Sequence, residues 1–226
     1  MSVSWLQTIT PWANPSPVSS GSFTPAAGDQ IPVFALNGSG SGASITITGT
    51  GGYSSLASAL NDSPTGKTLQ PWANSSCSSG AQTITNTGTA GNAMYAWAFE
   101  YASAVSLSAT HLVQANPGAG AGAILGTSVY AAAGAVLLAF CAALSTSAAT
   151  LTSPSGTNRG SGTLATIIPY CVTEYTGAGA NITPSFTCSV GASNRFYVAQ
   201  ILLTPPSVGG GSSANNLDGG LNGGFQ

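Results

Sequence analysis

Short apolar segments separated by turn-forming residues run along the chain. Residues 45–48 alternate apolar and polar side chains, which is typical of a strand with one buried face. Residues 31–36 and 136–141 are continuous apolar runs near glycines, as buried strands of a β-sandwich are. Further strands are expected at 83–85, 94–101, 167–170 and 196–203. Long amphipathic helices are not apparent, with at most a helical turn at 54–61, so the pattern predicts an all-β protein.

An internal repeat organises these segments. Five blocks recur in the same order: 25–34 resembles 131–140, 44–48 resembles 150–152, 69–72 resembles 167–170, 82–85 resembles 180–183, and 94–99 resembles 195–201. The repeat predicts two sequence-related halves, 18–105 and 128–206. We expect them to form one antiparallel, jelly-roll-like β-sandwich, because a single half has few large side chains and would bury a thin core. Two separate sandwiches are the alternative.

Two arms are expected outside the sandwich. Residues 1–17 carry Trp5 and Trp12 among Pro and Asn, and residues 207–226 are rich in Gly and Ser. Composition alone makes the second arm a flexible linker. Its spaced apolar residues, however, fit a segment held against a neighbouring chain. The predicted interface residues are Trp5, Trp12, Leu217, Leu221 and Phe225.

The charge content narrows the possible functions. Apolar residues make up 43% of the chain, enough for a sizeable core, but only 4% are charged, against roughly 25% in ordinary domains. Three basic residues cannot build the footprint that nucleic-acid binding requires. A net charge of −2 also provides little long-range steering of a partner. A neutral, hydroxyl-rich surface is better suited to an assembly than to a concentrated free monomer.

Neither secretion nor membrane insertion is expected. The N-terminus has no basic segment followed by an apolar run, so no signal peptide is predicted and synthesis in the cytoplasm is expected. The uncharged stretch 118–144 is diluted by Gly, Ala, Ser and Thr and lacks flanking cations, which favours strands over a membrane span.

The cysteines suggest neither zinc nor redox chemistry. Cys77, Cys141, Cys171 and Cys188 form no CxxC motif and have no nearby His, so no zinc site is predicted. Reduced thiols are expected. A disulfide between Cys171 and Cys188 remains the alternative, because a Gly-rich turn joins their strands.

Catalytic candidates are few. His111 is the only histidine, and no G-x-S-x-G motif accompanies it. Glu100 and Glu174 each precede a Tyr and could act as a glycosidase pair, but an ion pair with Arg159 or Arg195 is the interpretation we favour. We therefore predict no catalytic residues, no cofactor and no enzymatic activity.

The segments that could bind calcium or a sugar also have simpler structural interpretations. The segments 61–63 and 216–218 carry one acid each, which is typical of Asx turns rather than of calcium loops. The repeated Pro-Trp-Ala-Asn could present Trp12 and Trp72 to a sugar, but the repeat aligns Trp72 with Tyr170 and indicates a core residue. No metal site is predicted.

Several of these segments together resemble a family. They are FTPAAGDQIPVFAL at 23–36, ITITGTGGYSSL at 45–56, MYAWAFEYASA at 94–104, and the second AAAGAVLLAF segment from residue 131. This combination resembles two-half β-sandwich proteins of tailed-bacteriophage virions and bacterial surfaces, over about residues 20–206. The aromatic that follows Gly52 in the first half, Tyr53, has no clear counterpart in the second. The resemblance implies a structural role in a virion or on a surface, and it supplies no catalytic residues.

We therefore expect a virion structural protein of a tailed bacteriophage, most simply a protein that decorates or cements the capsid. Its expected partners are the major capsid protein or neighbouring copies of itself in a homo-oligomer, with neither nucleic acid nor membrane. A phage-tail or bacterial surface adhesin that binds glycan is the alternative.

Overall fold

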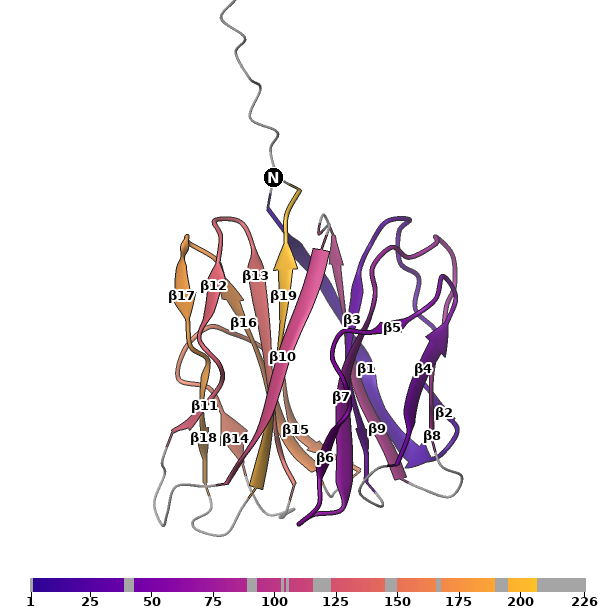
Figure 1. The fold of residues 1–226 in the computed structure, drawn as a ribbon. Helices are drawn as coiled ribbons and strands as arrows, with labels where there is room; N and C mark the ends of the chain where they lie inside the picture. The colour runs from indigo at the N-terminus through magenta and orange to yellow at the C-terminus, as the bar shows by residue number, and fades with distance from the viewer. Residues whose placement is uncertain are drawn as a thin grey trace, which may run out of the picture.

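The chain folds into antiparallel strands. A computed structural model describes residues 2–38, 43–88, 93–102, 104, 106–115, 123–144, 150–165, 168–189 and 195–206. The structure is 65% strand with several antiparallel sheets, and the described residues contain no helix (Figure 1). The predicted all-β class is confirmed.

Strands from the N-terminal part of the chain form one large and one small sheet. The large sheet has the order β1-β9-β3-β7-β5, with β6 also paired to β7, and the small sheet has the order β2-β8-β4. The strands are β1 (Ser4–Pro15), β2 (Val18–Ser19), β3 (Ile31–Asn37), β4 (Ile45–Gly49), β5 (Ser54–Ser55), β6 (Leu60–Asp62), β7 (Lys67–Asn74), β8 (Ile84–Gly88) and β9 (Ala93–Ala102).

Strands from the C-terminal part form a second large sheet, β10-β19-β13-β16-β15, and the smaller sheets β11-β18-β14 and β12-β17. The strands are β10 (Ser106–Ala115), β11 (Ile124–Leu125), β12 (Val129–Ala131), β13 (Val136–Ala143), β14 (Leu151–Thr152), β15 (Thr157–Leu164), β16 (Ile168–Thr176), β17 (Ala180–Ile182), β18 (Ser185–Cys188) and β19 (Arg195–Thr204). Within the described residues, no strand pairing joins β1–β9 to β10–β19.

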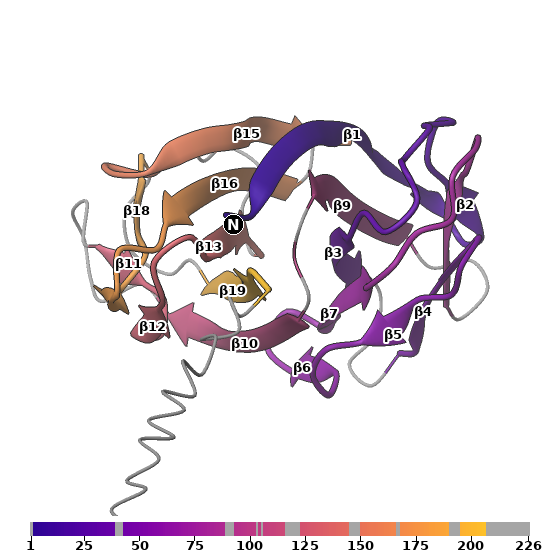
Figure 2. The same cartoon turned by 90° about the horizontal axis from the view of Figure 1, so that it is seen from above.

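The two large sheets face each other across a shared core, as the view along the strands shows (Figure 2). Phe34 of β3 and Phe140 of β13 meet in this core with their ring centroids 4.8 Å apart. Trp97 of β9 packs on the same Phe140 ring at 4.7 Å. Burial of aromatic rings is strongly stabilising, so these contacts help to hold the two sheets together.

The central strands are buried on both faces, which explains their continuous apolar sequences. On β3, Phe34 and Leu36 point into the shared core, whereas Val33 and Ala35 belong to a second core formed with β2, β4 and β8. Residues of β13 divide in the same alternating way between the shared core and a third core, which includes β11, β14 and β18. Because successive side chains of a strand point to opposite faces, each of these strands contributes residues to two cores.

Two segments differ from the sequence-based expectations. Residues 54–61 do not form a helical turn, because Ser54 and Leu60 pair with β7 as parts of β5 and β6. Most of the expected N-terminal arm is β1, an edge strand of the first large sheet that pairs along β9. The expected C-terminal arm, 207–226, lies outside the described residues. No helix in the described part of the chain is long and apolar enough to cross a membrane.

Candidate interaction surface

The only histidine is held by a tyrosine. His111 lies on β10 with its Nδ1 2.9 Å from the Tyr197 hydroxyl, and the two rings meet edge to face. Burial lowers the pKa of His111 and raises that of Tyr197 well above its ordinary value. Both groups are therefore neutral near pH 7. A neutral phenol orients the imidazole but lacks the negative charge with which the carboxylate of a catalytic triad stabilises an imidazolium.

Glu174 has a full set of structural partners. The Arg159 guanidinium donates two hydrogen bonds to the Glu174 carboxylate, of 2.9 Å from Nε to Oε2 and 2.8 Å from Nη2 to Oε1. The Tyr101 hydroxyl donates to Oε2 at 2.8 Å. Arg159 also lies 4.2 Å above the Trp5 ring, in cation–π geometry. Because Trp5 and Tyr101 come from the first large sheet and the ion pair from the second, this network joins the two sheets.

Asp62 and Arg195 form a second link between the two parts of the chain. Asp62 ends β6, Arg195 begins β19, and the Arg195 Nε lies 2.9 Å and 3.0 Å from the two carboxylate oxygens. Burial acts to raise the pKa of Asp62, but hydrogen bonds from Arg195 and Thr65 outweigh it and hold the pKa below its ordinary value. The Asp62 carboxylate is thus ionised near pH 7, where it pairs with Arg195.

Glu100 and Asp29 form a buried carboxyl pair. Burial raises the pKa of Glu100; a hydrogen bond from Gln7 acts against this, and the nearby Asp29 carboxylate raises it further. The Asp29 carboxylate accepts a 2.8 Å hydrogen bond from the Ala26 backbone. Glu100 is 3% exposed and Asp29 6%, so neither carboxyl is accessible to a sugar or to water for hydrolysis. The pair ties β9 to β1 and to the turn before β3.

The four cysteines are free and buried. Burial raises the pKa of Cys77 to about 12 and that of Cys141 well above its ordinary value. Thiols held protonated are poor nucleophiles and poor metal ligands. Cys171 and Cys188 form no disulfide in this structure. In the described part of the chain, no three His, Cys, Asp or Glu side chains are grouped so that they could hold a metal ion.

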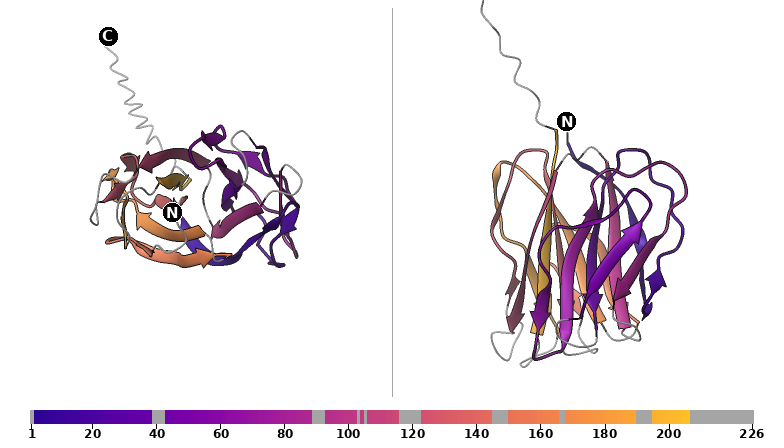
Figure 3. Two further views of the ribbon diagram at one scale, coloured as in Figure 1. Left: turned by 90° about the horizontal axis from the view of Figure 1, so that it is seen from below. Right: turned by 45° about the vertical axis from the view of Figure 1, so that its right-hand side comes forward.

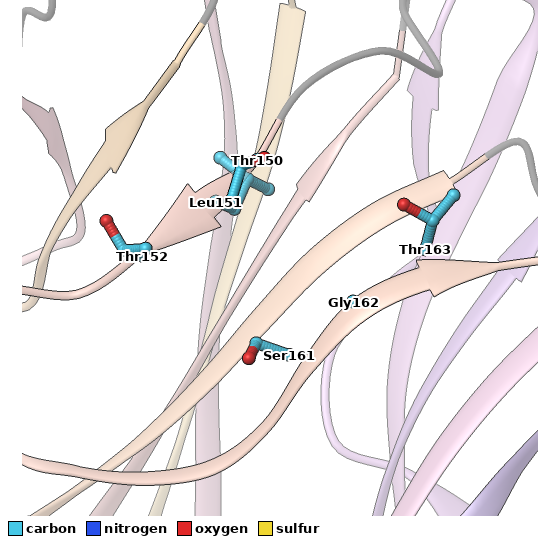
Figure 4. A pocket seen from close by; sticks show the side chains of 6 residues that line it. All are labelled: Thr150, Leu151, Thr152, Ser161, Gly162 and Thr163. Atoms are coloured by element: carbon cyan, nitrogen blue, oxygen red, sulfur yellow. The ribbon is translucent and has the colours of Figure 1, made fainter.

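Two shallow hollows are lined by neutral groups. One, of about 170 Å³, lies between β14 and β15 and is lined by Thr150, Leu151, Thr152, Ser161, Gly162 and Thr163 (Figure 4). The other, of about 110 Å³, lies between residues 7–10 of β1 and residues 21–23. Both are smaller than the usual ligand pocket of roughly 300–1,000 Å³. Their hydroxyl and amide groups can hydrogen-bond a neutral surface, but they provide no acid or base.

Large apolar side chains are exposed at two places among the described residues. Trp5 is 36% and Leu6 is 44% exposed on β1, and Leu125 and Tyr130 are 44% and 60% exposed on β11 and β12. Trp12, predicted to contact a partner, is 7% exposed and packs in the second core. The other predicted interface residues, Leu217, Leu221 and Phe225, lie outside the described residues.

Irregular pairing explains why two successive large residues are exposed on β1. Trp5 is opposite Tyr101 and Gln7 is opposite Glu100, so Leu6 is an extra residue without a partner on β9. Next to it, β1 runs beside β15, where the Thr8 hydroxyl donates a 2.9 Å hydrogen bond to the Arg159 carbonyl (Figure 2). The adjacent pair Trp5-Leu6 is the sequence signal of this bulge, and β1 has a second register shift between Ile9 and Trp12.

Comparison of the chain with protein-family models, with curated proteins and with solved structures finds no match.

Proposed function

We propose that this chain is a structural protein of a tailed-phage virion that decorates or cements the capsid through protein–protein contacts. The observation that carries the proposal is that charged side chains of this protein are paired with one another within the fold. Asp62, Glu174, Arg159 and Arg195 are engaged inside the fold, while Trp5 and Leu6 are exposed beside neutral, hydroxyl-lined surface. Such a surface suits binding to another protein rather than chemistry or the recognition of charge.

The sheet orders support a two-half β-sandwich architecture as part of this proposal. The two large sheets have corresponding strand orders. The order β1-β9-β3-β7 in the first sheet matches, strand by strand, the order β10-β19-β13-β16 in the second. The small sheet β2-β8-β4 corresponds in the same way to β11-β18-β14. We infer that each half is a jelly-roll-like pair of sheets, and that the halves pack through their large sheets instead of interleaving.

The proposed partners are the major capsid protein or neighbouring copies of this chain. A single contact through Trp5 and Leu6 is small, so it would be weak in isolation. On a lattice with many identical sites, each subunit held by several such contacts gains avidity without any strong individual contact. A virion location and a homo-oligomer follow from this proposal.

Purified particles provide the test. Tailed-phage particles from the source of this sequence would be separated from free protein on a density gradient, and the copies of this chain per major capsid protein counted by quantitative mass spectrometry. The proposal predicts a fixed ratio that survives repeated banding. Recovery of the chain only in the free-protein fractions would contradict it.

A glycan-binding adhesin is the second candidate, because Trp5 is partly exposed on β1 and residues 7–10 of the same strand line a hollow with hydroxyl and amide groups. Aromatic faces with hydrogen-bonding neighbours are common sugar platforms. A glycan array probed with wild type and with Trp5→Ala decides between the two candidates. Binding that Trp5→Ala abolishes favours the adhesin, and no binding by either protein excludes it for the sugars tested.

A further inference from the structure

Two cysteines face each other across neighbouring strands of the second large sheet. Cys141 of β13 is directly opposite Cys171 of β16. Both side chains belong to the third core, so they lie on the same face of the sheet. Directly opposite residues of an antiparallel pair have Cα atoms about 4.5–5.5 Å apart, and a disulfide spans about 4.4–6.8 Å between Cα atoms. The register therefore places two thiols at the separation that a disulfide requires.

A third cysteine of the same core lies on a different sheet. Cys188 is part of β18, where it is opposite Leu151 of β14. Burial raises the pKa of Cys141, and the nearby Cys171 and Cys188 raise it further, so the three thiols are close to one another. Among these three, strand register brings Cys141 and Cys171 together and pairs Cys188 with a leucine. We therefore expect Cys141 and Cys171 to be the pair that can bond.

The fourth cysteine provides an internal comparison. Cys77 belongs to the second core together with residues of β2 and β4, which lie on the opposite side of the molecule from β13, β16 and β18 (Figures 2 and 3). Burial raises the pKa of Cys77, and the groups that raise it further are the Asp29 and Glu100 carboxyls rather than a thiol. Cys77 is thus nearly as buried as Cys141 but has no cysteine beside it.

The sheet that covers the paired thiols consists of short strands. β11 and β14 have two residues each, and β18 has four. β13 and β16 have eight and nine residues and lie inside the large sheet. Elements with few backbone hydrogen bonds open at a lower free-energy cost than long core strands. Local opening of this small sheet would admit a small oxidant while β13 and β16 stay paired.

Cys171 is the better nucleophile of the pair. Burial raises its pKa, but a hydrogen bond with the Thr173 hydroxyl, 3.7 Å from the Cys171 Sγ, and one from the Ser153 backbone act against this. For Cys141, burial and the neighbouring thiols all act to raise the pKa. Because the thiolate is the reactive form, we expect Cys171 to be oxidised first and Cys141 to complete the bond.

We propose that Cys141 and Cys171 are an oxidisable thiol pair that hydrogen peroxide converts to a disulfide between β13 and β16. The Cys171 sulfur attacks one peroxide oxygen, the O–O bond breaks, and the other oxygen leaves as hydroxide, which the thiol proton converts to water. The Cys141 sulfur then attacks the sulfenic sulfur of Cys171, and the sulfenic hydroxyl leaves with the Cys141 proton as a second water. The two sulfurs are oxidised and the peroxide is reduced. The inference does not depend on a virion role.

Peptide mapping after peroxide treatment tests the pairing. Protein purified under reductant is exposed to hydrogen peroxide, the remaining thiols are alkylated in denaturant, and linked peptides are identified by mass spectrometry. We expect the main crosslink to join Cys141 and Cys171 within one chain. A main crosslink to Cys188 or to a second chain, or recovery of all four cysteines without a disulfide, would overturn the proposal.

Trapping of the sulfenic acid tests the order of the two steps. A 1,3-diketone reagent labels sulfenic acids but not disulfides. In Cys141→Ala the Cys171 sulfenic acid has no thiol opposite it, so labelling of Cys171 should rise at least several-fold over wild type. Cys77→Ala is the matched control, because Cys77 and Cys141 are 3% and 0% exposed, and it should leave the labelling unchanged. Equal labelling of Cys171 in all three proteins would refute its reaction with Cys141.

Discussion

At the scale of single residues, the few charges of this chain act as structural links. A buried ion pair carries a large desolvation cost and is favourable only with good geometry and complete hydrogen bonding. The Arg159–Glu174 pair meets that condition, with two hydrogen bonds between its members, a third from Tyr101 and a stacked Trp5 ring. The sequence indicated that one of the two glutamates, Glu100 or Glu174, pairs with Arg159 or Arg195. It could not tell which arginine pairs with which acid, because the partners meet only through the sheet register.

Removing Arg159 should destabilise the fold. Arg159→Ala leaves the Glu174 carboxylate, which is 8% exposed, without its cation, and we expect the free energy of unfolding to fall by about 3 kcal/mol. Arg159→Lys keeps the charge but loses the pair of hydrogen bonds and the stacking on Trp5. Its free energy of unfolding should therefore lie between those of wild type and of Arg159→Ala. Urea denaturation followed by circular dichroism measures both. A loss below about 0.5 kcal/mol for Arg159→Ala would show that the pair contributes nothing.

The Glu100 carboxyl should make the fold weaker at high pH. Its pKa is raised in the folded chain, chiefly by burial and also by Asp29, so the native state binds this proton more tightly than the unfolded state. The stability that this proton provides is complete below the unfolded pKa and is lost as pH rises through the folded one. Glu100→Gln removes the titration and preserves the shape, so its stability relative to wild type should increase with pH. Parallel stability–pH curves for the two proteins would exclude this account.

At the scale of elements, core strands and edge strands differ in how readily the sequence predicts them. The core strands β3, β9, β13 and β19 were predicted, because burial on both faces requires long apolar runs. β15 was not predicted, since it is an edge strand of sequence TNRGSGTL that pairs with β16 through its backbone and carries few apolar side chains. Residues 1–17 were interpreted as an arm because their apolar residues lie among Pro and Asn, and in the structure two register shifts interrupt the alternation of β1. An edge strand is held mainly by backbone hydrogen bonds to the neighbouring strand. Its own sequence does not show which strand that neighbour is.

One glycine shows how closely the elements approach. Gly177 follows β16, its N–H donates to the Ala135 carbonyl, and a Cβ on it would lie 2.2 Å from the Ala132 carbonyl oxygen. Gly177→Ala should therefore cost about 1–3 kcal/mol of stability through overpacking against backbone. At Gly160 of β15 the nearest atom to an added Cβ is 3.7 Å away, so Gly160→Ala should change stability by less than about 0.5 kcal/mol. Thermal unfolding of both variants measures the contrast, and equal melting temperatures would contradict the geometry.

At the scale of the whole molecule, three cores account for how so uncharged a chain folds. The shared core holds most of the buried aromatic residues, and the outer cores are lined more by Ala, Val, Ile and Cys. The candidate surface was foreseen only at Trp5. Leu6, Leu125 and Tyr130 are exposed for reasons of register and topology that the sequence does not record.

The central claim is that this protein acts by fitting its uncharged surface against a neighbour, with Trp5 and Leu6 in the contact. Rebinding to virions that lack the chain tests it most directly, with labelled protein and particles separated by sedimentation. Wild type should bind saturably, and changing both Trp5 and Leu6 to Ser should weaken binding at least tenfold, since loss of one buried anchor is worth about 1.4 kcal/mol or more. The matched change of Leu125 and Tyr130 to Ser should leave binding intact. Equal binding by all three proteins, or no binding by wild type, would contradict the account.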